Sequence, residues 1–94
     1  MTRKKVREFY EKHPDSEPAL KAFSKYIDKA SWKSPSEVRR WNNTCKILKN
    51  NRVRFEILGN KYRVIVKIEY EFQIAYVRFI GTHAEYDKID ANTI

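Results

Sequence analysis

The sequence contains few of the residues that build metal and cofactor sites. Its 94 residues include one cysteine, two histidines and two glycines. A single cysteine cannot form an internal disulfide, and one cysteine with two distant histidines has no zinc-ligand spacing. Two isolated glycines exclude a glycine-rich nucleotide-binding loop. We therefore expect neither a metal nor a cofactor, and we expect Cys45 to be a buried structural residue.

Long hydrophobic runs are absent as well. A membrane-spanning helix needs about 18 consecutive apolar residues, and no stretch of this chain comes near that length. The chain opens with no signal peptide, and a lone cysteine is typical of a protein from a reducing compartment. We therefore expect a soluble, cytoplasmic protein with no membrane partner.

The chain does have enough apolar material for one hydrophobic core. Hydrophobic residues make up 41% of the sequence and aromatic residues 14%, whereas a disordered chain is depleted in both. A chain of this length has no room for a second core. We predict one domain over residues 1–94.

Positive charge is concentrated in the first half of the chain. Twenty Lys and Arg residues against twelve Asp and Glu residues give a net charge of +8. Residues 1–54 carry 15 basic and 6 acidic side chains, whereas residues 55–94 carry 5 and 6. Such a field attracts polyanions, so nucleic acid or an acidic partner protein is expected. A basic surface that serves only solubility is the alternative.

Helical periodicity is found in the first half of the chain. Apolar residues three and four positions apart predict a helix over residues 3–12. A second helix, capped by Asp15 or Ser16, is expected to run to about Trp32. The run Ser34-Pro35-Ser36-Glu37 has the spacing of a capping box and predicts a third, short helix.

The period changes to two after Thr44, which predicts strands near residues 52–58, 61–70 and 74–81. Residues 45–48 can add a short strand, and Gly59-Asn60 suits a tight hairpin turn. The predicted fold class is therefore α+β, with N-terminal helices packed on one face of a small antiparallel sheet. The side chains expected in the core are Phe9, Leu20, Phe23, Ile27, Val53, Phe55, Ile57, Val64, Val66, Ile68, Val77 and Phe79.

Strand alternation leaves a basic set of residues on the other face of the predicted sheet. This set comprises Arg52, Arg54, Lys61, Arg63, Lys67 and Arg78, and Tyr76 shares its parity. Cations beside an aromatic ring suit RNA phosphates and a stacked base. An ordinary solvated sheet face is the alternative.

A cluster of ionisable residues follows the last predicted strand, in the run Thr82-His83-Ala84-Glu85-Tyr86-Asp87-Lys88. A histidine can exchange a proton at neutral pH, and tyrosine or lysine can donate to an oxyanion. Such a set suits RNA cleavage, in which a ribose 2′-hydroxyl attacks the adjacent phosphate and no cofactor is needed. A histidine with only a structural hydrogen bond is the alternative.

The runs Val53–Val64 and Tyr76–Lys88 resemble the HigB family of type II toxin–antitoxin systems, and the segments Arg7–Asp15 and Trp32–Pro35 are also similar to that family. The resemblance covers nearly the whole chain. It implies a RelE-like fold and the activity of an mRNA interferase, an endoribonuclease that cleaves mRNA in the ribosomal A site. It also implies neutralisation by a HigA-like helix-turn-helix antitoxin, for which the basic charge favours an acidic surface.

The resemblance and the basic face together give a set of expected site residues. The expected catalytic residues are His83 as general acid or base, Arg63 and Arg78 as stabilisers of the phosphate, and Tyr86 as a stacking platform or proton donor. The expected RNA-binding residues are Asn60, Lys61, Lys67, Arg52, Arg54, Tyr76 and Lys88. Asp87 is expected to orient His83 or Lys88, and Glu85 is also expected to be an orienting residue. One departure from the family is that only Met1-Thr2 precede the first helix, so we expect the family's short first strand to be stunted or lost.

Two other functions are compatible with the sequence. The basic sheet face would suffice for a non-catalytic RNA- or DNA-binding module. A related toxin could also keep the fold and inhibit a topoisomerase by binding.

Overall fold

The helices form the first half of the molecule. The computed structural model describes residues 3–94. Helix α1 spans Arg3–Lys12, the short 3-10 helix η1 spans Pro14–Ser16, α2 spans Glu17–Lys29 and α3 spans Pro35–Trp41. No helix in the described residues is long and apolar enough to cross a membrane. The three predicted helices are confirmed, although α2 ends three residues before Trp32.

The cap of α3 differs from the prediction. Ser34 occupies the N-cap position, but its side chain makes no capping hydrogen bond. The Glu37 carboxylate instead accepts a hydrogen bond from the backbone N–H of Lys33. The predicted reciprocal capping box is therefore wrong, although the helix begins where its spacing indicated.

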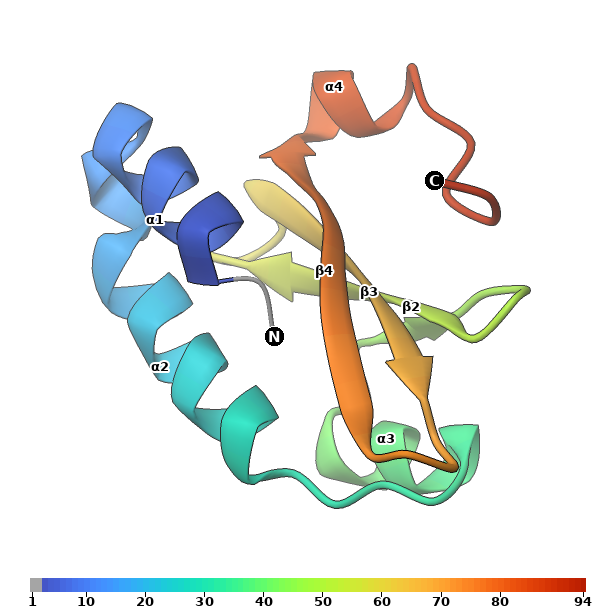
Figure 1. The fold of residues 1–94 in the computed structure, drawn as a ribbon. Helices are drawn as coiled ribbons and strands as arrows, with labels where there is room; N and C mark the ends of the chain where they lie inside the picture. The colour runs from blue at the N-terminus through green and yellow to red at the C-terminus, as the bar shows by residue number, and fades with distance from the viewer. Residues whose placement is uncertain (1–2) are drawn as a thin grey trace.

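The second half is an antiparallel sheet that ends in a short helix. The strands are β1 (Lys46–Ile47), β2 (Arg52–Ile57), β3 (Tyr62–Glu69) and β4 (Ile74–Thr82), followed by α4 (His83–Tyr86). The strands lie in sequence order in the sheet. Figure 1 shows α1 and α2 along one side of the sheet, with α4 at the end of β4 and the C-terminal segment after it. The predicted α+β architecture is confirmed.

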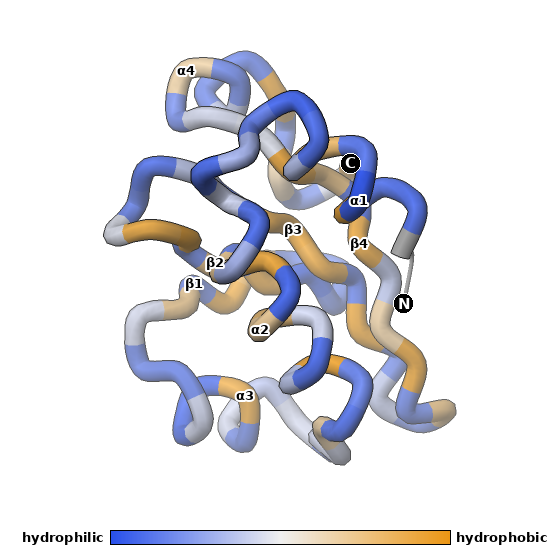
Figure 2. The backbone as a smooth tube through the Cα atoms, turned by 90° about the vertical axis from the view of Figure 1, so that its left-hand side faces the viewer, coloured by the Kyte–Doolittle hydropathy of each residue, from blue (hydrophilic) through white to orange (hydrophobic). Residues whose placement is uncertain are grey.

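The core lies between the helices and one face of the sheet. Leu20, Phe55 and Val64 have no exposed surface, and Figure 2 shows the strongly hydrophobic β3 in the middle of the molecule. Cys45 is also buried, and burial raises the pKa of its thiol. The other predicted core residues are buried, with Phe9 partly buried against them and one exception on β4.

The exception is Phe79, because a β-bulge changes the phase of β4. Val66 pairs with Val77, but Ile65 pairs with Phe79, so Arg78 is an extra residue on β4. Phe79 therefore lies half-buried on the face away from α1 and α2, which we call the outer face, and Ile80 packs against the core. The prediction that Phe79 is a core residue is wrong, because alternation does not reveal an inserted residue.

The outer face is also less exposed than strand alternation predicted. Arg52 and Arg63 are each only 8% exposed, and Ile65 on the same face has no exposed surface. The C-terminal segment returns to this side of the molecule, where Asn92 accepts a hydrogen bond from the Lys49 backbone N–H at 2.9 Å. The alternative of an ordinary solvated sheet face therefore does not describe the positions of Arg52 and Arg63. The family's first strand would fall on residues 1–2, which lie outside the described residues.

Candidate active site

The site is centred on a contact between Arg63 of β3 and His83, the first residue of α4. Arg63 pairs with Gly81 across the two strands, and this register brings the residue after β4 within reach of the guanidinium. Nη2 of Arg63 lies 2.7 Å from Nε2 of His83. Because a guanidinium only donates hydrogen bonds, Nε2 of His83 is the acceptor and carries no proton. Arg63 and His83, both predicted catalytic residues, therefore lie together.

A capping box at Thr82 sets the direction of α4. The Thr82 hydroxyl accepts a hydrogen bond from the Glu85 backbone N–H at 3.2 Å, and the Glu85 carboxylate accepts one from the Thr82 N–H at 3.0 Å. This backbone hydrogen bond is the largest of the effects that hold the pKa of Glu85 below its ordinary value. Glu85 therefore caps the short helix whose first residue is His83.

Tyr86 presents its ring to the arginines of the outer face. The Cζ atom of Arg63 lies 4.6 Å from the ring centroid and that of Arg54 lies 5.8 Å from it, both within cation–π range. The Phe79 ring packs 6.4 Å from the Tyr86 ring. A Cβ atom at position 81 would lie 2.5 Å from the tip of the Phe79 ring, so a larger residue than Gly81 would make this ring shift. The bulge that removed Phe79 from the core thus places it beside Tyr86.

Asn60 holds Arg63 from the hairpin side. Its backbone has a φ of 79°, in the left-handed region that asparagine tolerates in tight turns. Its side-chain oxygen accepts a hydrogen bond from Nε of Arg63 at 3.1 Å. The guanidinium is therefore fixed by Asn60 on one side and by His83 and Tyr86 on the other.

Arg54 and Glu56 lie on β2, next to Arg63 on the outer face of the sheet. Nη2 of Arg54 lies 3.1 Å from the Glu56 carboxylate, and Glu56 pairs with Arg63 across β2 and β3. Nε of Arg54 is buried and has no hydrogen-bond partner among the described residues. Sequence reasoning missed Glu56, although its outward parity on a basic strand was a usable signal.

Asp87 and Lys88 follow directly after Tyr86. A carboxylate oxygen of Asp87 lies 3.4 Å from Nδ1 of His83, one helical turn away. Both residues are exposed. The structure therefore brings Asp87 close to the His83 ring, whereas the exposed Lys88 is the next residue along the chain.

Lys61 contacts η1 and not the pair of Arg63 and His83. Its ammonium contacts Asp15, whose carboxylate also accepts a hydrogen bond from the Tyr62 hydroxyl at 2.8 Å. These two side-chain hydrogen bonds are the largest effects that lower the pKa of Asp15. Lys61 therefore ties the hairpin to the helical layer.

The remaining predicted residues lie further along the outer face. Arg52 donates hydrogen bonds to the main-chain oxygens of Ile94, Thr93 and Asn50 at 2.7, 3.2 and 3.0 Å, so each of its three nitrogens already bonds the chain itself. Lys67 and Tyr76 pair across β3 and β4. Arg78 contacts the Ile94 oxygen at 3.4 Å, and Gly81 lies three positions further along the chain. At about 3.3 Å per residue, Arg78 lies about 10 Å along β4 from the position opposite Arg63.

The arrangement combines an unprotonated imidazole nitrogen with a fixed cation and an aromatic platform. These groups can accept a proton and stabilise a negatively charged phosphate. No group of three histidine, cysteine, aspartate or glutamate side chains within residues 3–94 is arranged to hold a metal ion.

Comparison with known proteins places the chain in a family. A model of the HigB toxin family, described as the RelE-like toxic component of a toxin–antitoxin system, matches residues 16–89. The chain is 31% identical over 90 residues to the mRNA interferase toxin HigB of Escherichia coli (strain K12), a match that covers 93% of this chain and 86% of the relative. The mRNA interferase HigB of Shigella flexneri matches equally well. This chain therefore belongs to the HigB family of RelE-like toxins of toxin–antitoxin systems.

Proposed function

We propose that the chain is an mRNA interferase, an endoribonuclease that cuts messenger RNA and so stops translation. The contact between Arg63 and His83 beneath the ring of Tyr86 carries this proposal. The three residues come from two elements that the sheet register brings together, and each offers a group that phosphodiester cleavage needs. The names of the similar proteins support the same activity.

The proposed reaction begins when an RNA phosphate binds the guanidinium of Arg63 and replaces its hydrogen bond to His83. The Nε2 atom of His83 is then free to accept the proton of the ribose 2′-hydroxyl. The 2′-oxygen forms a bond to phosphorus and the bond to the 5′-oxygen breaks, which leaves a 2′,3′-cyclic phosphate and a 5′-hydroxyl end. The leaving oxygen takes a proton, for which the Tyr86 hydroxyl is the proposed donor. No metal is needed for these steps.

Two side chains, those of Asp87 and Asn60, are proposed to position His83 and Arg63. Asp87, at 3.4 Å from Nδ1 of His83, favours the ring tautomer that leaves Nε2 free as a base. Asn60 holds Nε of Arg63, so the donors at the other end of the guanidinium point at the phosphate. Arg54, Lys67, Arg78, Tyr76 and Lys88 are proposed to bind the RNA on either side of the scissile bond.

Arg52 and Lys61 are proposed to have supporting roles, unlike the residues that bind RNA directly. Arg52 is proposed to support the RNA-binding face from below rather than to bind RNA strongly, because it is only 8% exposed and each of its nitrogens bonds a main-chain oxygen. Lys61 acts as a positioning residue through Asp15 and the hairpin that carries Asn60.

The partners of the chain follow from the same proposal. Membership of a toxin–antitoxin family implies an antitoxin. We propose a helix-turn-helix protein with an acidic surface, because the net charge of +8 favours an acidic binding partner. The proposed substrate is mRNA in the A site of the ribosome, and the proposed site of action is the cytoplasm.

Sequencing of RNA 5′ ends after brief expression tests the proposed activity. The wild-type chain should arrest growth and create new ends at fixed positions within codons, and co-expression of the antitoxin should prevent both. The His83→Ala variant should create no new ends. Growth arrest without new ends would instead favour a toxin that inhibits a topoisomerase by binding, and arrest that survives His83→Ala would favour a non-catalytic binding module.

A further inference from the structure

A hollow on the outer face lies apart from the proposed cleavage centre. It has a volume of about 430 Å³ and is lined by Lys67, Glu69, Phe72, Tyr76 and Arg78. Lys67 and Tyr76 pair across β3 and β4, and Phe72 lies in the turn between these two strands. The hollow therefore brings two cations and two aromatic rings to one end of the sheet.

The two rings are unusually exposed for aromatic side chains. Phe72 is 68% exposed and Tyr76 is 40% exposed. Exposing a phenylalanine ring to water is unfavourable, and the aromatic surface of a protein is usually covered by the core or by a partner. The ring of Phe72 therefore offers a face on which a planar, apolar surface can stack.

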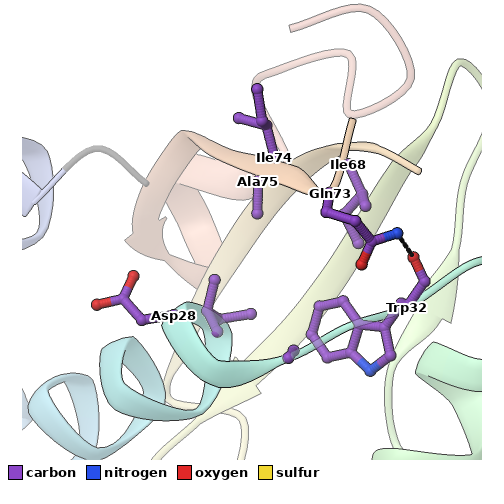
Figure 3. A pocket seen from close by; sticks show the side chains of 8 residues that line it. Asp28, Trp32, Ile68, Gln73, Ile74 and Ala75 are labelled. Carbon is purple, nitrogen blue, oxygen red and sulfur yellow. Dashed lines mark hydrogen bonds between the residues drawn. The ribbon is translucent and has the colours of Figure 1, made fainter. Parts of the chain in front are cut away.

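The turn that carries Phe72 is held in one shape from the helical side. Gln73 has a φ of 57°, and its side-chain nitrogen donates hydrogen bonds at 2.7 Å to the main-chain oxygens of Trp32 and Tyr70. Figure 3 shows the Gln73 amide reaching the Trp32 oxygen beside a pocket that Asp28 and Ile68 also line. The position of the Phe72 backbone is thereby fixed before any ligand binds, which lowers the entropy cost of binding.

The charges of the hollow favour an anionic ligand. Arg78 is exposed, and Lys67 forms an ion pair with Glu69 at 3.2 Å on the same face. Nε of Arg78 also lies 3.4 Å from the main-chain oxygen of Ile94. Cations interleaved with stackable rings are the combination that binds single-stranded nucleic acid, in which every base has an aromatic face and every link has a phosphate.

We propose that this hollow is a second subsite for single-stranded RNA, in which a base stacks on Phe72 and Tyr76 and a phosphate pairs with Arg78 and Lys67. The inference rests on the proposed ribonuclease function, because it extends the same RNA along β4. His83 lies seven positions after Tyr76, which corresponds to about 23 Å in a strand. A stacked single strand that rises about 3.4 Å per nucleotide spans that distance in about seven nucleotides.

Binding of 2′-O-methyl RNA, which the enzyme cannot cleave, tests the subsite. A decanucleotide and a trinucleotide would be titrated by fluorescence anisotropy against the wild-type chain, Phe72→Ala and Phe72→Tyr. We expect Phe72→Ala to weaken decanucleotide binding by about tenfold, with a much smaller loss for the trinucleotide, because a stacked base is lost only from the longer RNA. Phe72→Tyr keeps the aromatic face and should bind like the wild type.

Tyr26→Ala is the matched control, because Tyr26 is a 60% exposed aromatic residue on α2. It should bind both RNAs like the wild type. Equal decanucleotide affinity of Phe72→Ala and the wild type would overturn the subsite, as would a loss of antitoxin binding without a loss of RNA binding. If the wild-type chain binds neither RNA and cleaves no mRNA, both the subsite and the proposed function are wrong. If it binds and cleaves but Phe72→Ala has no effect, only the subsite is wrong.

Discussion

At the scale of single residues, Arg63 has the contacts on which the site depends. Its Nε contacts Asn60, its Nη2 contacts His83, and the face of its guanidinium lies against Tyr86. A planar fork can make these three contacts at once, whereas the single ammonium of a lysine cannot. Position 63 therefore requires the shape of a guanidinium as well as its positive charge.

We accordingly predict that Arg63→Lys lowers the rate of mRNA cleavage by about 10²-fold or more, because the phosphate loses an oriented cation. The measurement is the cleavage rate of the purified variant, with its thermal unfolding followed in parallel to show that the fold is kept. A rate near that of the wild type would mean that charge suffices and that the observed contacts are not needed.

Asp15 provides a prediction on pH. Hydrogen bonds from Lys61 and Tyr62 lower its pKa below the ordinary value of 3.8. A carboxyl group whose pKa is lower in the folded than in the unfolded state stabilises the fold above the unfolded pKa and loses this effect as the pH falls through the folded pKa. The contribution of Asp15 is therefore present at neutral pH and is lost in acid below about pH 3.8.

The Asp15→Asn variant should consequently melt at a lower temperature than the wild type at neutral pH, and the difference should shrink as the pH falls toward 2. Thermal unfolding of both proteins across this range is the measurement. A difference that stays constant with pH would show that the ionised carboxylate contributes nothing.

At the scale of elements, α4 is a four-residue helix that depends on its cap. Thr82 and Glu85 satisfy each other's backbone N–H groups, and the helix places His83 and Tyr86 against Arg63. A helix this short has almost no stability of its own, so loss of the cap should loosen both site residues.

We predict that Thr82→Ala lowers the free energy of unfolding by about 1 kcal/mol. It should also lower the cleavage rate under conditions in which the variant is fully folded. Thr82→Ser keeps a hydroxyl acceptor and should retain both properties. Chemical denaturation and cleavage rates of the two variants are the measurements. If Thr82→Ala cleaves as fast as Thr82→Ser, the capping box does not position the site.

Some features of the strands and of the candidate site can be predicted from the sequence, and others cannot. The strands and the approach of His83 to Arg63 were predictable, because alternation fixes the face of each residue and adjacent strands bring their ends together. Arg78, which the same reasoning expected at the same phosphate, lies about 10 Å further along β4 and contacts the Ile94 oxygen instead. The bulge at Arg78 was not predictable, since the inserted residue is neither glycine nor flanked by a break in the pattern. The positions of Lys61 and Arg52 depend on Asp15 and Ile94, which are distant in the sequence.

At the scale of the whole molecule, the excess of positive charge governs association with a partner. A net charge of +8 creates a field that speeds the approach of an acidic protein, and dissolved salt screens this field over about 8 Å at physiological ionic strength. We predict that the association rate with the antitoxin falls as the salt concentration rises. Stopped-flow mixing at several salt concentrations measures this, and an association rate independent of salt would contradict an electrostatic encounter.

The most direct test of the proposed activity is the single-turnover rate of mRNA cleavage by the purified chain in a reconstituted translation system. The wild type is compared with His83→Ala and with His13→Ala, whose histidine stacks on Phe9 with ring centroids 4.4 Å apart and lies outside the cluster of Arg63, His83 and Tyr86. Loss of the proton-transfer group should lower the rate by about 10²- to 10⁴-fold, whereas His13→Ala should cleave at the wild-type rate. A folded His83→Ala variant that cleaves as fast as the wild type would contradict the assignment of the active site.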